Sequence, residues 1–150
     1  MIKTIYAYKR RVHYYETDKT GTVHHSNHLK WMDEARIFML NQAGVPFDEI
    51  ERQGIVVSVI RAEINFKYFL RFNDVFNVFL KITSLKAPGM EIKYNIVNAD
   101  GSVSLAEGRT LHCFLDTDLN IIRLKRNYPE IYDLLHKFDQ YEMKISPDTV

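Results

Sequence analysis

The stretch HYYETDKTGTVHHSNHLKWMDEAR, residues 13–36, joins a strand-like segment to a helix-like one and decides the fold. An isolated acid, Asp18, comes first, and Gly21 follows it in a short turn. Two histidines, His24 and His25, stand immediately before the helix-like part. The sequence therefore places an acid and two imidazoles at the entrance to a helix.

A long helix is predicted over residues 27–43. Apolar residues recur there at helical spacing and make one stripe: Leu29, Met32, Ala35, Met39, Leu40 and Ala43. Ser26 or Asn27 can cap the first turn, and Gly44 followed by Pro46 ends the helix.

The rest of the chain reads mainly as strands, because it is dense in Val, Ile, Tyr and Phe. We expect strands over residues 3–15, 55–72, 74–85, 90–98 and 102–116. The turn-type sequences APG, residues 87–89, and NADG, residues 98–101, have the length of hairpin connections. The strands after the helix are therefore expected to form an antiparallel meander.

This order of elements predicts an α+β fold in which one antiparallel sheet covers one long helix. A short helix is predicted over residues 127–138, and the tail, residues 140–150, is expected to be mobile or a late addition. The chain of 150 residues is most simply one domain, 1–150. The other face of the sheet would be bare, and an apolar face would need a partner, so we expect a homo-oligomer.

Composition excludes several classes of protein. The 20 basic and 19 acidic residues give a formal net charge of +1, whereas a nucleic-acid-binding domain is usually strongly basic. The one cysteine, Cys113, allows no internal disulfide, which favours a reducing compartment. Residues 1–15 carry charges throughout, unlike a secretory signal, and no segment approaches the roughly 20 apolar residues that span a bilayer. We expect a cytoplasmic protein.

The opening stretch has the parts of an acyl-transfer site. Asp18 lies in a loop, and Gly21 permits a tight turn with positive φ. Residues 24–28 lie where the helix begins, so their backbone N–H groups should be unpaired and suit a developing oxyanion. A carboxylate facing such donors could attack a carbonyl or deprotonate a water molecule that does. These residues therefore favour a hydrolase that needs few side chains.

Other interpretations of the same residues stay open. Asp18 could be a turn or cap residue. His24, His25 and His28 could be surface residues or a partial metal site, since the first and third have i,i+4 spacing. The chain has no His-Glu-x-x-His pattern that would strengthen the metal interpretation.

Four further residues are most simply structural. Cys113 lies in an apolar strand, which favours a buried thiol over a catalytic one. Asp33 and Glu34 are expected on a solvated helix face. Trp31 is expected to be a packing residue at the oligomer interface.

The segment YYETDKTGTVHHSNHLKWMDEAR, residues 14–36, resembles the signature of the hotdog-fold thioesterases of the 4-hydroxybenzoyl-CoA thioesterase type, which include the Tol-Pal-associated acyl-CoA thioesterases. Asp18 falls on the family's catalytic aspartate, and His25 falls on the position whose backbone N–H faces the thioester carbonyl. Asn27 and the DEAR run match as well. INFKYFLRFND, residues 64–74, resembles a strand that usually reads Tyr-x-x-Pro-x-x-x-Gly-Asp.

The resemblance, which covers about residues 3–120, implies a hotdog fold with a five-stranded antiparallel sheet around one helix and an extension over residues 121–150. It implies hydrolysis of an acyl-CoA thioester, with Asp18 as nucleophile or general base and His25 beside it, and no metal or cofactor. It also implies a homodimer or homotetramer with active sites at the subunit interface. The other candidate residues are expected to bind substrate: Gly21, His24, Asn27 and Trp31.

The chain departs from the family near the acyl pocket. Lys19 and Thr20 replace small residues, His24 replaces an aromatic residue, His28 replaces Tyr, and the proline of the later strand is missing. These changes leave the acyl group open. Four cations are candidates for the CoA phosphates: Arg61, Lys67, Arg71 and Lys86.

Two alternatives on the same fold remain. One is a module that binds acyl groups or acyl carrier protein without catalysis. The other is a dehydratase, for which Asp33 and Glu34 would be poor helix acids because they look solvent-facing.

Overall fold

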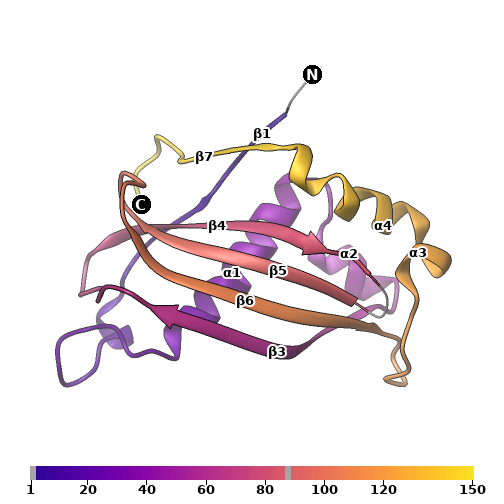
Figure 1. Cartoon of the computed structure of the whole chain (residues 1–150), viewed down its shortest axis with the longest axis horizontal. Helices are drawn as coiled ribbons and strands as arrows, with labels where there is room; N and C mark the ends of the chain where they lie inside the picture. The colour runs from indigo at the N-terminus through magenta and orange to yellow at the C-terminus, as the bar shows by residue number, and fades with distance from the viewer. Residues whose placement is uncertain (1–2, 87–88) are drawn as a thin grey trace.

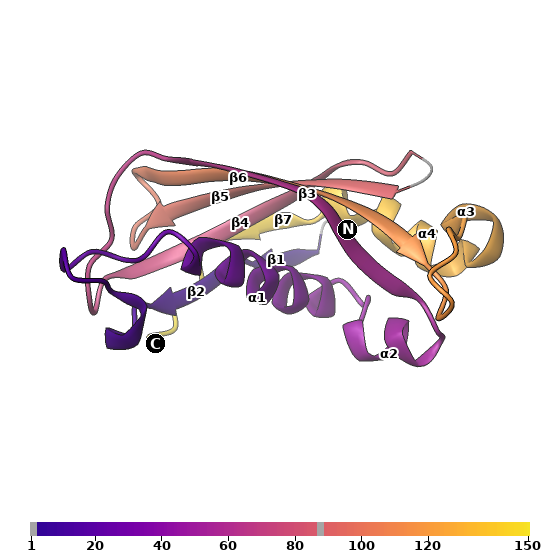
Figure 2. The same ribbon diagram turned by 90° about the horizontal axis from the view of Figure 1, so that it is seen from below.

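The computed structural model describes residues 3–86 and 89–150, and it confirms the predicted α+β architecture. A five-stranded antiparallel sheet covers one long helix, α1, as Figures 1 and 2 show in perpendicular views. The strands are β1 (Thr4–Tyr6), β2 (Tyr8–Arg11), β3 (Val56–Phe66), β4 (Val75–Ser84), β5 (Gly89–Asn98), β6 (Ser104–Leu115) and β7 (Glu142–Lys144). The helices are α1 (Asn27–Gln42), α2 (Phe47–Arg52), α3 (Leu124–Asn127) and α4 (Pro129–His136), with 3-10 turns η1 (Tyr14–Glu16) and η2 (Phe138–Gln140).

The main sheet has the strand order β2-β4-β5-β6-β3. The predicted meander is confirmed for β4, β5 and β6 but wrong for β3, which pairs with β6 at the far edge. The connection from β3 to β4 is held against the loop before α1, because the carbonyl of Leu70 accepts a 2.8 Å hydrogen bond from the amide of Val23. The side chain of Leu70 is buried there. Of the expected APG turn, residues 87 and 88 lie outside the described residues.

The core lies between α1 and the sheet. Four residues of α1 have no exposed surface: Trp31, Met32, Ala35 and Met39. The Trp31 ring lies 4.3 Å from that of Phe76 on β4. A Cβ atom on Gly108 of β6 would meet the Cε atom of Met32 at 2.2 Å. The helix therefore approaches β6 closely because residue 108 has no side chain.

Both termini differ from their predictions. Residues 3–15 form three elements: β1 pairs with β7 in a separate parallel sheet, β2 joins the main sheet, and η1 follows. The tail, expected to be mobile or a late addition, holds β7 and runs beside β2. Lys9 of β2 donates hydrogen bonds to the carbonyls of Ser146 and Asp148, the latter at 3.0 Å. The tail therefore lies along one edge of the sheet.

The short helix predicted over residues 127–138 is confirmed as α4, whereas two other short helices were missed. α3 ends at Asn127, and the chain breaks between it and α4 because Tyr128 precedes Pro129 and has a non-helical φ of −140°. α2 was not predicted, since six residues are too few to show a period.

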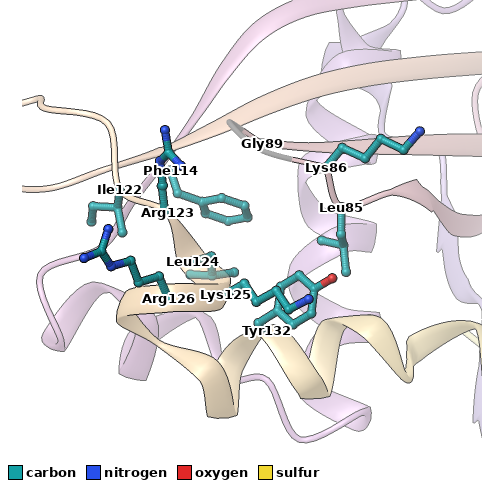
Figure 3. A pocket seen from close by; sticks show the side chains of 10 residues that line it. All are labelled: Leu85, Lys86, Gly89, Phe114, Ile122, Arg123, Leu124, Lys125, Arg126 and Tyr132. Atoms are coloured by element: carbon teal, nitrogen blue, oxygen red, sulfur yellow. The ribbon is translucent and has the colours of Figure 1, made fainter.

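Figure 3 shows the pocket that α3 and α4 form with the sheet. Among the described residues, no helix has the length and apolar character needed to cross a membrane.

The outer face of the sheet is charged rather than apolar. Glu63 pairs with Arg61 at 2.6 Å and with Arg109 at 2.7 Å. Lys67 pairs with Glu107 at 2.9 Å. This face therefore does not need the apolar partner that the sequence left open.

A chain of hydrogen bonds crosses the core. Arg36 donates to the Tyr94 hydroxyl at 3.1 Å, that hydroxyl contacts Thr110 at 2.8 Å, and Thr110 contacts His112 Nε2 at 2.7 Å. His112 is fully buried, and its Nδ1 atom has no partner among the described residues. Burial lowers the pKa of His112 from 6.5 to about 4, and the positive charge of Arg36 adds to this.

The depressed pKa of His112 predicts acid sensitivity. In the unfolded chain the imidazole takes up a proton at higher pH than in the folded chain, so stability is lost as pH falls from 6.5 towards 4. Between about pH 7 and about pH 4.5 we expect this group to remove about 2 kcal/mol of unfolding free energy. His112→Gln should lack that part of the pH dependence in urea titrations, whereas His136→Gln, at an exposed position, should keep it. Equal pH dependence in both variants would contradict the assignment.

Candidate active site

The loop between β2 and α1 forms a closed turn at Asp18. The carbonyl of Asp18 accepts a 3.0 Å hydrogen bond from the amide of Gly21, and the amide of Asp18 donates to the carbonyl of Thr22 at 2.9 Å. Gly21 has a φ of +82°, a conformation that glycine adopts without strain. The turn that the sequence predicted around Gly21 is therefore present.

The carboxylate of Asp18 is exposed and ionised. Its Oδ1 atom accepts hydrogen bonds from the Thr20 amide at 2.8 Å and from the Thr20 hydroxyl at 2.5 Å. These two bonds lower the pKa of Asp18, and the nearby imidazoles of His24 and His25 lower it further. Asp18 is therefore an anion at neutral pH.

The three histidines differ in environment. His24 and His25 are exposed, and their rings stack with centroids 4.2 Å apart. His28 is buried, with its ring edge-on to Phe66 at 4.8 Å, and desolvation lowers its pKa. His24 precedes α1 and contacts the Ser26 hydroxyl at 2.8 Å, so the i,i+4 geometry of a helical metal site is not formed. The described residues contain no cluster of three or more metal-ligating side chains.

The backbone at the start of α1 offers a free donor. The amides of Val23, His24, Ser26 and Asn27 all donate hydrogen bonds within the chain. None of the residues that the structure describes accepts a hydrogen bond from the amide of His25. An unpaired N–H at the positive end of a helix suits a ligand oxygen.

Two predicted site residues lie behind the loop rather than at its surface. Asn27 is buried, and its Nδ2 atom donates to the carbonyls of Glu16 at 2.9 Å and of His24 at 3.1 Å. Trp31 is completely buried, which confirms its packing role and leaves it no surface for a substrate or a second copy. Cys113 is buried, as predicted.

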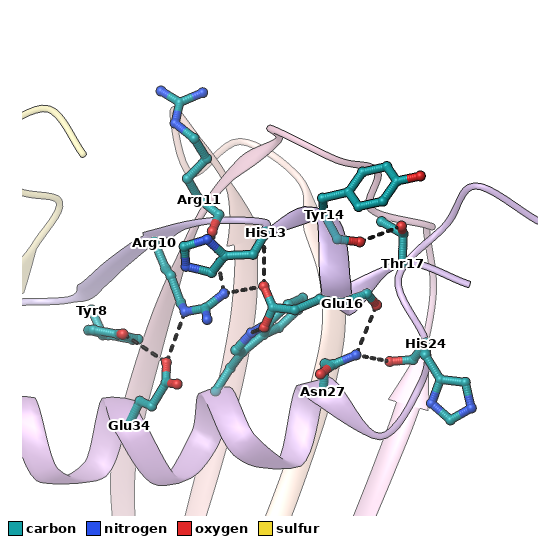
Figure 4. Close-up of polar contacts among 11 residues, drawn as sticks. Tyr8, Arg10, Arg11, His13, Tyr14, Glu16, Thr17, His24, Asn27 and Glu34 are labelled. Atoms are coloured by element: carbon teal, nitrogen blue, oxygen red, sulfur yellow. Dashed lines mark hydrogen bonds and ion pairs between the residues drawn. The ribbon is translucent and has the colours of Figure 1, made fainter. Parts of the chain in front are cut away.

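The residue that sequence reasoning missed is Glu16, which is only 3% exposed. Figure 4 shows its carboxylate accepting hydrogen bonds from Arg10 at 2.5 Å and from the His13 amide at 2.8 Å. Trp31 Nε1 donates to it at 2.8 Å. Burial alone would raise the pKa of Glu16, but these bonds together lower it. The only sequence signal was an acid two positions before Asp18.

The same network corrects the prediction for one helix acid. Glu34 lies 3.0 Å from Arg10 Nε and accepts a 2.8 Å hydrogen bond from the Tyr8 hydroxyl, so it is half-buried and paired rather than a free solvated acid (Figure 4). Asp33 is exposed, as predicted, and pairs with Arg36 at 2.9 Å.

An apolar recess of about 190 Å³ opens beside the free amide. We call it the aromatic recess; it is lined by Val23, His25, His28, Phe66, Tyr68, Phe69 and Leu70. Tyr68 and Phe69 are 61% and 79% exposed, which is unusual for large apolar side chains in a free surface loop. The aromatic density of residues 64–74 could have signalled this wall.

The four candidate phosphate-binding cations lie in different parts of the molecule. Arg61 and Lys67 are engaged in ion pairs with Glu63 and Glu107 on the outer sheet face. Arg71 forms an isolated antiparallel β-bridge with Thr22 and therefore lies beside the Asp18 turn. Lys86 lines the pocket that α3 and α4 form with the sheet, which Figure 3 shows. Of the four, Arg71 is nearest to the loop before α1.

Comparison with known proteins gives consistent matches. The Thioesterase-like superfamily matches residues 12–138. A protein of Aquifex aeolicus with a provisional esterase name is 34% identical over 110 residues, 73% of this chain and 84% of that protein. A 1,4-dihydroxy-2-naphthoyl-CoA hydrolase of Prochlorococcus marinus is 26% identical over 116 residues, 73% of this chain and 76% of the relative. The solved DHNA-CoA thioesterase of Staphylococcus aureus has a TM-score of 0.83 at 26% identity and covers 93% of this chain and 92% of its own.

Glu16 and Glu34 both pair with Arg10, but only Glu16 is fully buried. We therefore expect substitution of the two acids to lower the unfolding free energy by different amounts. Glu16→Gln leaves the 11%-exposed Arg10 side chain without its buried partner and should lower the unfolding free energy by about 3 kcal/mol. Glu34→Gln removes the partly exposed partner and should cost less than about 1 kcal/mol. Urea denaturation at neutral pH measures both, and equal costs would show that Glu16 has no special structural role.

Proposed function

The chain belongs to the thioesterase-like superfamily, and we propose that it hydrolyses an acyl-CoA thioester to the free acid and CoA. The observation that supports this most is the free amide of His25, a residue that lines the aromatic recess and whose imidazole lies near the ionised Asp18. A carboxylate, an oxyanion donor and an apolar acyl site are the parts that thioester hydrolysis requires.

In the proposed reaction, the thioester carbonyl oxygen accepts a hydrogen bond from the His25 amide. The positive end of α1 stabilises the charge that develops on this oxygen. Asp18 either attacks the carbonyl carbon or takes a proton from the water molecule that attacks it. The carbon–sulfur bond then breaks and CoA leaves as the thiolate. The lowered pKa of Asp18 keeps the carboxylate ionised for either role.

The acyl group would occupy the aromatic recess. Its wall carries Phe66, Tyr68 and Phe69, and ring faces accept both aromatic and aliphatic groups. His25 and His28 line the same recess, and His24 stacks on His25. The naphthoyl-CoA activity named for two of the relatives makes an aromatic acyl group a reasonable first substrate.

The proposed site is completed by a second copy of the chain. Asp18 is fully exposed in a single chain, whereas hydrolysis of a bound thioester benefits from a shielded site. The tail lies along the β2 edge of the sheet, but β3 is an edge strand of 11 residues with no strand beyond it among the described residues. Val59 and Ile60 on that strand are 44% and 55% exposed. Pairing through β3 would give a homodimer, which could pair again into a tetramer.

The alternatives make different demands. A dehydratase would need a free acid on α1, but Glu34 is held by Tyr8 and Arg10 and Asp33 is paired with Arg36. A non-catalytic acyl-binding module would bind the thioester without releasing thiol. A thiol-release assay against aromatic and aliphatic acyl-CoAs separates hydrolysis from binding.

The catalytic assignment of Asp18 has a matched control in the same chain. Asp100 accepts hydrogen bonds from the amide and hydroxyl of Ser102, the same local turn that Asp18 makes with Thr20, but it lies in the β5–β6 hairpin. Asp18→Asn should lower kcat/KM by about 100-fold in the thiol-release assay. Asp100→Asn should leave it unchanged. Wild-type turnover by Asp18→Asn would remove Asp18 from the mechanism.

A substitution at Ile60 tests the proposed pairing of two copies through β3. Ile60→Arg adds a cation beside Arg61 on the β3 edge of both copies, so repulsion should shift the protein to monomers in analytical ultracentrifugation. Activity should fall with the fraction of oligomer. Val103→Arg changes an apolar side chain that is 38% exposed in the turn between β5 and β6, outside β3, and should preserve both properties. An unchanged sedimentation pattern for Ile60→Arg would exclude this interface.

A further inference from the structure

A second pocket, of about 440 Å³, lies far from the Asp18 turn. Figure 1 places α3 and the loop between β2 and α1 at opposite ends of the sheet, and the pocket shares no lining residue with the aromatic recess. Its volume is in the range of small-molecule sites. We call it the basic pocket.

The floor of the basic pocket is apolar. Five apolar or aromatic residues line it: Leu85, Phe114, Ile122, Leu124 and Tyr132. The Ile122 amide donates to the carbonyl of Phe114 at 2.8 Å, which ties the chain entering α3 to the end of β6. The floor is therefore built from the sheet and the C-terminal helices together, as Figure 3 shows.

The rim of the basic pocket carries four cations: Lys86, Arg123, Lys125 and Arg126. All four are exposed, and none of the described residues that line the pocket is an acid. Apolar and basic residues alternate over the first four positions of IRLKR, residues 122–126. Ile122 and Leu124 are therefore buried, while Arg123 and Lys125 are exposed. Lys125 Nζ lies 5.6 Å from the centre of the Tyr132 ring, which links the rim to the floor.

These cations differ from those on the outer sheet face. Arg61, Lys67 and Arg109 are all paired with carboxylates there. Among the described residues, none of the four rim cations has an ion pair. A group of unpaired like charges around an apolar floor raises the local concentration of anions and favours one that also carries an apolar group.

We propose that the basic pocket binds an anionic amphiphile, in which a carboxylate or phosphate is joined to an apolar or aromatic group. The apolar group lies on the floor between Phe114 and Tyr132, and the anion contacts Arg123 and Arg126. Two sources share this chemistry: a long-chain carboxylic acid, and the phosphorylated adenosine end of CoA. The binding does not depend on hydrolysis at Asp18.

Isothermal titration calorimetry with four probes tests the proposal. Decanoate and adenosine 3′,5′-bisphosphate represent the two sources, and decanol and inorganic phosphate represent the apolar and anionic parts alone. We expect at least one of the first pair to bind about tenfold or more tightly than either of the second pair. Whichever binds identifies the source. If neither binds more tightly than the separate parts, the proposal is wrong.

Variants with equal changes of net charge locate the binding. The double variant Arg123→Gln/Arg126→Gln should weaken the tighter probe by about tenfold or more. The control, Lys81→Gln/Lys93→Gln, removes two exposed cations from adjacent strands elsewhere and should change affinity by less than about twofold. Equal loss in both would assign the effect to net charge and overturn the site.

Asp18→Asn separates this proposal from the proposed function. Probe binding should be unchanged in that variant, whatever its thioesterase activity. Loss of probe binding on Asp18→Asn would place the ligand at the Asp18 turn and contradict a separate site.

Discussion

The buried carboxylate of Glu16 is the interaction on which the geometry of the loop depends. It accepts hydrogen bonds from a guanidinium, a backbone amide and an indole, and these offset the several kcal/mol that desolvation of a carboxylate costs. The carbonyl of Glu16 accepts from the amide of His24 and the side chain of Asn27. One residue thus ties β2, the loop and the first turn of α1 together. Since Asp18 follows two positions later and His25 follows His24, both ends of the proposed site are held by this one buried charge.

The local sequence around Asp18 does not by itself make a site. Asp100 with Ser102 reproduces the hydrogen bonds that Asp18 makes with Thr20, and in both cases they lower the pKa of the aspartate. Asp100 lies in a hairpin between two strands, with no helix start beside it. What distinguishes Asp18 is the neighbouring free amide of His25 and the aromatic recess. The chemistry proposed at this position therefore rests on the tertiary placement of an ordinary turn.

Periodicity predicted what depends on local pattern. The α1 helix, the alternating strands β4 to β6 and the glycine turn at Gly21 were all readable, because each is set by spacing or by one residue type. The edge position of β3 could not be predicted in this way. The connection from β3 to β4 is fixed by a hydrogen bond between Leu70 and Val23, two residues that lie far apart in sequence. Glu16 was missed for the same reason: an acid in a loop reads as solvated unless its distant donors are known. The signature stretch located the proposed site, whereas the division between surface residues and supporting residues required coordinates.

The C-terminal extension explains why the two edges of the sheet differ. An edge strand exposes unpaired backbone groups and invites pairing with another chain. Here the tail lies along β2, where Lys9 holds the carbonyls of Ser146 and Asp148, and the charged outer face resists stacking. No segment of the described residues covers β3 in this way: it is long, and Ile60 is more than half exposed. The same extension supplies α3 and α4, and with them three of the four unpaired cations of the basic pocket. The C-terminal residues therefore cover the β2 edge and leave the β3 edge uncovered, and they form part of a second cationic surface at the other end of the sheet.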